Sequence, residues 1–269
     1  MKEAFATTAG RIASVFLLLS ILSGCSNVQG GTGRAPALEV LETASVLPAN
    51  PITPTSALSS YAFPASIDPS KRYLFYIHGK IIEDQGLPAI SPDYGEYEYE
   101  AILKKLSSYG FVVISDQRPK NADGVEYATK ITQQVKTLLN AGVLAKNITV
   151  VGASKGAAIA IYVSHFLENK AVSYVIMAIC HPDNVADFIN SQISLVGNVL
   201  SIYDSSDELA GSCKSLFSFS AGKGLARHEE LVLEIGTGHG ILYKPLDAWV
   251  LPVIQWAGDS PGELPGSPQ

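Results

Sequence analysis

Residues 148–158 read ITVVGASKGAA, and this stretch decides the fold that the chain is expected to adopt. Four β-favouring residues lead into Gly-Ala-Ser-Lys-Gly, and a run of small residues that favours a helix follows. Gly-x-Ser-x-Gly between a strand and a helix predicts a sharp turn that holds Ser154 in strained backbone geometry and exposes its hydroxyl above the sheet. Side chains larger than Gly or Ala two positions away would collide with the neighbouring strand and helix.

Strand and helix signals alternate through the rest of the chain. Short apolar runs predict strands at 73–77, 111–115, 148–151, 172–179, 199–203 and 231–235. Helical patterns cover 97–109, 125–140, 157–167 and 246–256. Because short buried strands alternate with longer helices, we expect βαβ units and a mostly parallel sheet in a three-layer α/β/α sandwich. Functional loops of such sheets gather at the carboxyl ends of the strands.

Two loops downstream of Ser154 can supply its catalytic partners. SIYDSSDELAG (201–211) places two aspartates just beyond a predicted strand, and EIGTGHGILY (234–243) places His239 beyond the last one. A serine hydroxyl needs a general base within hydrogen-bond reach, and the base needs a carboxylate to fix its tautomer. We therefore expect Ser154 to attack and His239 to carry the proton, with an aspartate orienting His239.

Asp207 is the expected acid. Asp204 directly follows the strand and precedes two serines, which fits an Asx turn or a cap better than catalysis. Asp207 lies three residues further out, where the loop can reach the histidine. Asp183, which follows the preceding strand, is the runner-up, and His181 is a weaker alternative base.

This set of residues resembles the α/β-hydrolase superfamily from about residue 70 to 257. The order serine, acid, histidine is the order of that fold. The resemblance implies an α/β-hydrolase fold with a minimal lid and a serine hydrolase that cleaves a carboxylic ester or thioester through an acyl-enzyme. It implies no metal and no cofactor. The alternative is a catalytically inactive binding or assembly module on the same fold.

The same resemblance implies an oxyanion hole. The amide of Lys155, directly after the serine, would be one donor. His78-Gly79-Lys80 resembles the His-Gly stretch that lines this hole in the superfamily, with Lys80 where a second glycine is usual. The second donor is therefore expected in the Gly79–Lys80 region.

A long acidic stretch, IIEDQGLPAISPDYGEYEYE (81–100), follows the first predicted strand and its His-Gly motif. We expect it to overhang the site, and four residues in and before it to contact the substrate: His78, Glu83, Asp84 and Tyr94. The alternative is a packed surface loop.

The first 25 residues differ from the rest. Lys2 and Arg11 give a positive start, and residues 12–22 (IASVFLLLSIL) form an apolar run shorter than the roughly 20 residues that span a bilayer. Leu-Ser-Gly-Cys at 22–25 resembles the bacterial lipobox, in which Cys25 becomes the lipidated first residue. An ordinary signal peptide is the alternative.

Four regions follow from these observations: a signal peptide at 1–24, a lipid-anchored tether at 25–60 rich in Gly, Pro, Ser and Thr, a hydrolase domain at 61–257 and a disordered tail at 258–269. The expected location is the bacterial cell envelope, at the outer membrane if the source is Gram-negative. The expected partners are the membrane, through Cys25, and a small-molecule or lipid ester substrate. The 269 residues carry a net charge of −6 and no basic stripe, which argues against nucleic acid.

Cys180 and Cys213 are the remaining cysteines. The compartment outside the inner membrane is oxidising, and each cysteine follows a strand at the same sheet edge. We predict a disulfide between them, with two buried free thiols as the alternative.

Overall fold

A six-stranded sheet forms the centre of residues 58–258, the part of the chain that the structure, a computed structural model, describes. Neighbouring strands are all parallel, in the order β4-β1-β5-β6-β7-β8. Their bounds are β1 Arg72–Ile77, β4 Phe111–Ile114, β5 Ile148–Ala153, β6 Ser173–Met177, β7 Gly197–Asp204 and β8 Leu225–Leu233. A separate antiparallel hairpin pairs β2 (Ile90–Ser91) with β3 (Gly95–Glu96).

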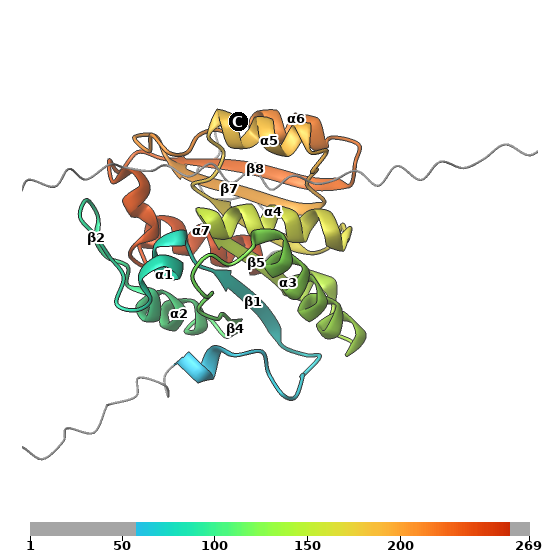
Figure 1. The fold of residues 1–269 in the computed structure, drawn as a ribbon. Coiled ribbons are helices and arrows are strands. Elements are labelled where there is room, and N and C mark those ends of the chain that lie inside the picture. The colour runs from blue at the N-terminus through green and yellow to red at the C-terminus, as the bar shows by residue number, and fades with distance from the viewer. Residues whose placement is uncertain (1–57, 259–269) are drawn as a thin grey trace, which may run out of the picture. The chain divides into compact units, whose positions relative to one another are not determined.

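Helices cover both faces of the sheet (Figure 1). One face carries α3 Gly124–Asn140, α4 Lys155–Leu167, α5 Pro182–Asn190 and α6 Lys214–Ser220. The other carries α1 Lys80–Gln85, α2 Tyr99–Ser107 and α7 Asp247–Gly258. Short 3₁₀ helices complete the order: η1 Leu58–Tyr61, η2 Ala145–Asn147 and η3 Gly238–Leu242. The predicted three-layer sandwich with a mostly parallel sheet is therefore confirmed.

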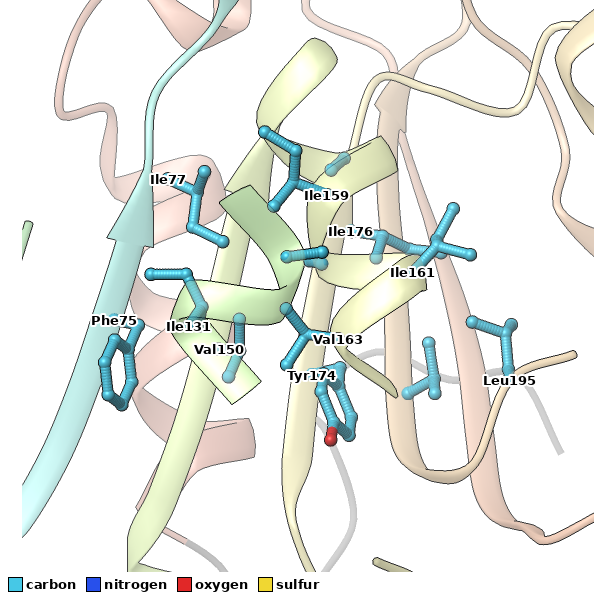
Figure 2. Packing of buried hydrophobic residues seen from close by; sticks show 14 of the residues in the cluster. Phe75, Ile77, Ile131, Val150, Ile159, Ile161, Val163, Tyr174, Ile176 and Leu195 are labelled. Atoms are coloured by element: carbon cyan, nitrogen blue, oxygen red, sulfur yellow. The ribbon is translucent and has the colours of Figure 1, made fainter. Parts of the chain in front are cut away.

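The strand side chains divide between two cores. In β1, Phe75 and Ile77 enter the core under α3 and α4, whereas Leu74 and Tyr76 enter the core under α2 and α7. This alternation is the two-residue period of a strand that is buried on both faces. Figure 2 shows part of the first core, in which strand residues such as Phe75 and Val150 form one cluster with helix residues such as Ile131 and Val163.

The strand order creates a topological switch point. The chain leaves β1 towards β4 at one side and later returns to place β5 on the other side of β1. Connections that diverge in this way leave a crevice at the carboxyl ends of the two strands, where ligands bind in open α/β sheets. Gly79 follows β1 and Ser154 follows β5, so both lie at this crevice.

Several elements differ from the prediction. The last strand begins at Leu225 rather than at residue 231. Its first half was not predicted as a strand because exposed and half-buried residues alternate there, as they do in a strand at the edge of a sheet. His228 consequently lies inside β8, where its ring packs against Phe217. Helices α5 and α6 were not predicted, and the region read as one long loop contains α1 and the β2–β3 hairpin.

The structure does not describe residues 1–57 or 259–269, so the predicted signal peptide, Cys25, most of the tether and most of the tail lie outside the described residues. Between residues 58 and 258, none of the helices is both long and apolar enough to span a membrane.

Candidate active site

Ser154 occupies the turn between β5 and α4. Its backbone has φ 52° and ψ −119°, a combination that costs a non-glycine residue free energy. The surrounding structure holds this conformation: the Ser154 amide donates to the Met177 carbonyl on β6 at 2.9 Å, and the Ser154 carbonyl accepts from Ala157 at 2.8 Å. The turn therefore has the strained geometry that the sequence predicts.

The two flanking glycines are required by close backbone contacts. A Cβ on Gly152 would lie 2.2 Å from the Gly156 carbonyl oxygen, and a Cβ on Gly156 would lie 1.9 Å from the Ile77 carbonyl oxygen. Real Cβ atoms essentially never come so close to backbone atoms. The Gly-x-Ser-x-Gly pattern thus lets β5 turn sharply into α4 while α4 packs tightly against β1.

Ser154, His239 and Asp207 form a continuous hydrogen-bonded chain. His239 Nε2 lies 3.0 Å from Ser154 Oγ, and His239 Nδ1 lies 2.8 Å from Asp207 Oδ2. The Asp207 side chain is 1% exposed and that of His239 12% exposed, so solvent screens their interaction weakly. An imidazole that donates to Asp207 from Nδ1 presents Nε2 to the serine as a proton acceptor.

Asp204 and Asp183 lie elsewhere. Asp204 Oδ1 accepts from the Ser206 amide at 2.9 Å, and its Oδ2 accepts from the Ile235 amide at 3.1 Å. Burial acts to raise the pKa of Asp204, but these hydrogen bonds outweigh it, and the pKa lies below its ordinary value. The Asp183 side chain is 91% exposed beside His181, away from Ser154 and His239.

The Gly79–Lys80 turn lies against the nucleophile. A Cβ on Gly79 would lie 3.7 Å from Ser154 Cβ and 3.7 Å from the Ala153 carbonyl oxygen. Lys80 is the first residue of α1 and Lys155 the first of α4. The helix starts that carry both expected oxyanion donors therefore lie at this crevice.

A pocket of about 170 Å³ opens beside Ser154. Its wall is largely apolar and aromatic, and its lining residues are Gly79, Lys80, Ile81, Tyr97, Ser154, His239, Leu242 and Tyr243. Tyr97 and Tyr243 pack ring to ring at 5.0 Å, and burial raises the pKa of Tyr97 to about 12, so its hydroxyl keeps its proton. This wall was not predicted from the sequence, because nothing in the chain order shows that residues 97 and 243 meet.

Two of the four expected substrate contacts are wrong. His78 and Glu83 are buried, and both engage Arg118 instead of the pocket. Asp84 is half-buried and pairs with Lys80, four positions earlier in the chain. The structure places Tyr94 at the site: its ring lies 6.5 Å from that of His239, and it covers Gly240.

Arg118 was not singled out from the sequence. The sequence shows only that Arg118 is a basic residue a few positions beyond a predicted strand. It does not show that the side chain is fully buried.

The structure joins Cys180 to Cys213 by a disulfide. The two residues are 33 positions apart, and closing such a loop stabilises the fold by about 3–4 kcal/mol in the chain-entropy treatment. The bond closes off the segment that carries Asp207, which lies between the two cysteines in the chain. Among residues 58–258, no group of three or more His, Cys, Asp or Glu side chains is placed to hold a metal ion.

The chain has the α/β-hydrolase fold. In that fold a serine lies in the turn after an inner strand of a parallel sheet, and later loops supply first the acid and then the histidine.

Three of the solved structures that are similar to this chain are the following. Arabidopsis thaliana SOBER1 is 14% identical, with a TM-score of 0.47, and the match covers 69% of this chain and 100% of that one. A predicted CIB-like hydrolase from Thermoplasma acidophilum is 16% identical, with a TM-score of 0.45, covering 70% and 87%. Esterase PE8 is 14% identical, with a TM-score of 0.44, covering 67% and 90%.

No protein-family model matches the chain. No curated protein matches it either.

Proposed function

We propose that this protein is a serine hydrolase that cleaves an ester-type bond, a carboxylic ester or a thioester, through an acyl-enzyme. The observation that carries the proposal is the unbroken chain from Ser154 Oγ through His239 to the buried Asp207 carboxylate. Ser154 has a strained backbone, its Oγ lies 3.0 Å from His239 Nε2, and His239 Nδ1 lies 2.8 Å from Asp207 Oδ2. This arrangement activates a hydroxyl nucleophile.

The reaction follows from the contacts. His239 Nε2 takes the proton of Ser154 Oγ as the oxygen attacks the carbonyl carbon, and the carbonyl oxygen becomes an oxyanion. The amides of Lys80 and Lys155 stabilise that oxyanion. His239 then returns the proton to the leaving alkoxide or thiolate, and Asp207 stabilises the imidazolium in between. A water activated by His239 attacks the acyl-enzyme and releases the acid and Ser154.

The pocket favours a small acyl group. Its volume of about 170 Å³ is below the roughly 300–1,000 Å³ of typical small-molecule sites. Acyl carbons that reach beyond the wall formed by Tyr97 and Tyr243 gain no further burial there. We therefore propose short acyl esters or thioesters as the substrate class.

Hydrolysis of p-nitrophenyl esters of increasing acyl length tests this function. We expect kcat/KM to be highest for acetyl or butyryl and to fall by octanoyl, and we expect Ser154→Ala to abolish turnover. Folded protein that hydrolyses none of these esters or their thioester analogues would contradict the proposal and favour an inactive binding module.

We also propose that the enzyme acts at the bacterial cell envelope, tethered by a lipid on Cys25. The support is the sequence alone, namely the apolar run followed by Leu-Ser-Gly-Cys at 22–25.

A further inference from the structure

Three charged side chains form a buried ion cluster beneath the crevice: Glu83, Arg118 and Lys155. Glu83 Oε2 accepts from Arg118 Nε at 3.1 Å, and Glu83 Oε1 accepts from Lys155 Nζ at 2.6 Å. The side chains of Glu83 and Arg118 are 0% exposed and that of Lys155 is 14% exposed. Burying three charges is costly, and apolar residues of similar size often stabilise a fold as well or better. Stability alone is therefore a weak reason for the cluster.

One end of the ion cluster holds the Gly79–Lys80 turn. Arg118 Nη2 donates to the His78 carbonyl at 2.6 Å and to the Gly79 carbonyl at 3.4 Å. The Arg118 amide donates to His78 Nε2 at 3.0 Å, while His78 Nδ1 donates to the Gly79 carbonyl at 2.7 Å. Burial, with the charge of Arg118, lowers the pKa of His78 to about 3, which keeps the ring neutral as these contacts require. Arg118 and His78 together thus fix the carbonyl groups of the turn.

The other end of the ion cluster holds the elbow. Lys155 directly follows Ser154, and its Nζ donates to the Ala122 carbonyl at 2.8 Å as well as to Glu83. The Glu83 carboxylate therefore connects the turn after β1, through Arg118, with the turn after β5, through Lys155. These two turns lead into Lys80 and Lys155, whose amides are the proposed oxyanion donors.

We propose that Glu83 is a positioning residue of the active site, whose carboxylate fixes the spacing between the two oxyanion donors. This inference rests on the proposed hydrolase function. The spacing of the two donors matters most in the transition state, where the carbonyl oxygen carries a full charge. A change in this spacing should therefore lower kcat more than it changes KM, because the substrate carbonyl carries little charge before attack.

The first test is Glu83→Gln, which keeps the shape of the side chain and removes its charge. We expect kcat on p-nitrophenyl acetate to fall on the order of 10²-fold, as for a misplacement of about 1 Å at a reacting centre, with KM unchanged within about twofold. Rates are expressed per active site, counted by titration with a fluorophosphonate. A merely structural role would lower the melting temperature but leave kcat per active site unchanged.

The matched control is Asp116→Asn. Asp116 lies two residues before Arg118 and pairs with Lys130 at the surface, where both side chains are more than 40% exposed. Removing this exposed pair should leave kcat and KM unchanged. If the loss of any acidic partner near Arg118 lowered kcat, Asp116→Asn would lower it too.

A second pair of variants keeps the test decisive if Glu83→Gln does not fold. Lys155→Met removes the link to the elbow but leaves the buried Glu83–Arg118 pair intact, so we expect it to fold and to lose kcat with little change in KM. Lys155→Arg keeps a charge within reach of Glu83 and should recover part of the loss.

The outcomes separate the two proposals. An active wild type whose Glu83→Gln and Lys155→Met variants keep kcat within about twofold overturns this inference alone. A folded wild type without any esterase activity overturns the proposed function and, with it, the inference.

Discussion

Asp204 and Asp207 are three residues apart and differ in role because they face different partners. Asp207 directs Oδ2 at the imidazole of His239, and its Oδ1 accepts from the Leu209 amide at 2.9 Å. Asp204 directs both oxygens at backbone amides and the Ser206 hydroxyl. The first carboxylate is placed to act on the base, and the second joins the loop after β7 to the loop after β8.

Asp207→Asn should nearly silence the enzyme while leaving it folded. An amide at this position can no longer hold His239 in the tautomer that presents Nε2 as an acceptor, and the expected loss in kcat is on the order of 10⁴-fold. Steady-state kinetics alongside circular dichroism would check this. If Asp183→Asn caused the large loss and Asp207→Asn did not, the assignment of the acid would be wrong.

Asp204→Asn should act on stability instead. Because the folded-state pKa of Asp204 is lower than its ordinary value, its ionised form stabilises the fold above about pH 4, and this contribution disappears as the pH falls through the folded-state pKa. We expect the substitution to lower the free energy of unfolding by about 1.5–3 kcal/mol at pH 7.

Urea denaturation at pH 7 and below pH 3.5 measures that difference. The gap between wild type and Asp204→Asn should shrink at the lower pH. A gap of equal size at both values would show that the charge of Asp204 is not what stabilises the loop.

The turn between β5 and α4 was predictable because its cause is local. Two glycines around a serine, with a β-favouring run before and small residues after, describe a geometry that depends on neighbours within a few positions. The triad followed from the order of elements, since Asp207 and His239 come directly after strands whose carboxyl ends share one edge.

The elements that were missed depend on tertiary contacts. The first half of β8 is polar because it lies at the sheet edge, and only the strand order reveals that. Glu83 was expected to contact the substrate, yet α1 turns it inward to meet Arg118 and Lys155 from distant segments. A buried ion pair cannot be distinguished from solvated charges by composition or period.

The candidate site lies at the crevice that the strand order leaves at the carboxyl ends of β1 and β5. The first parallel crossover runs from β1 to β4 and a later one brings in β5, so the Gly79 turn and Ser154 face each other between diverging connections. The hairpin of β2 and β3 brings the Tyr94 ring to within 6.5 Å of the His239 ring, beside the site.

The proposed attachment to a membrane depends on Cys25, which lies outside the described residues. Cys25→Ser should prevent lipidation, leave unprocessed precursor and abolish metabolic labelling with a fatty acid analogue, because the thiol is the acceptor in the lipobox that the sequence resembles. Normal cleavage and release of the Cys25→Ser protein would identify an ordinary signal peptide instead.

The most direct test of the central claim is the reaction of the purified protein with a fluorophosphonate, followed by mass spectrometry of the intact chain and of its peptides. We expect one adduct per chain, located on Ser154, absent from Ser154→Ala and formed much more slowly in Asp207→Asn. Well-folded protein that acquires no adduct, or that carries the adduct on another residue, would contradict the assignment of Ser154 as the nucleophile.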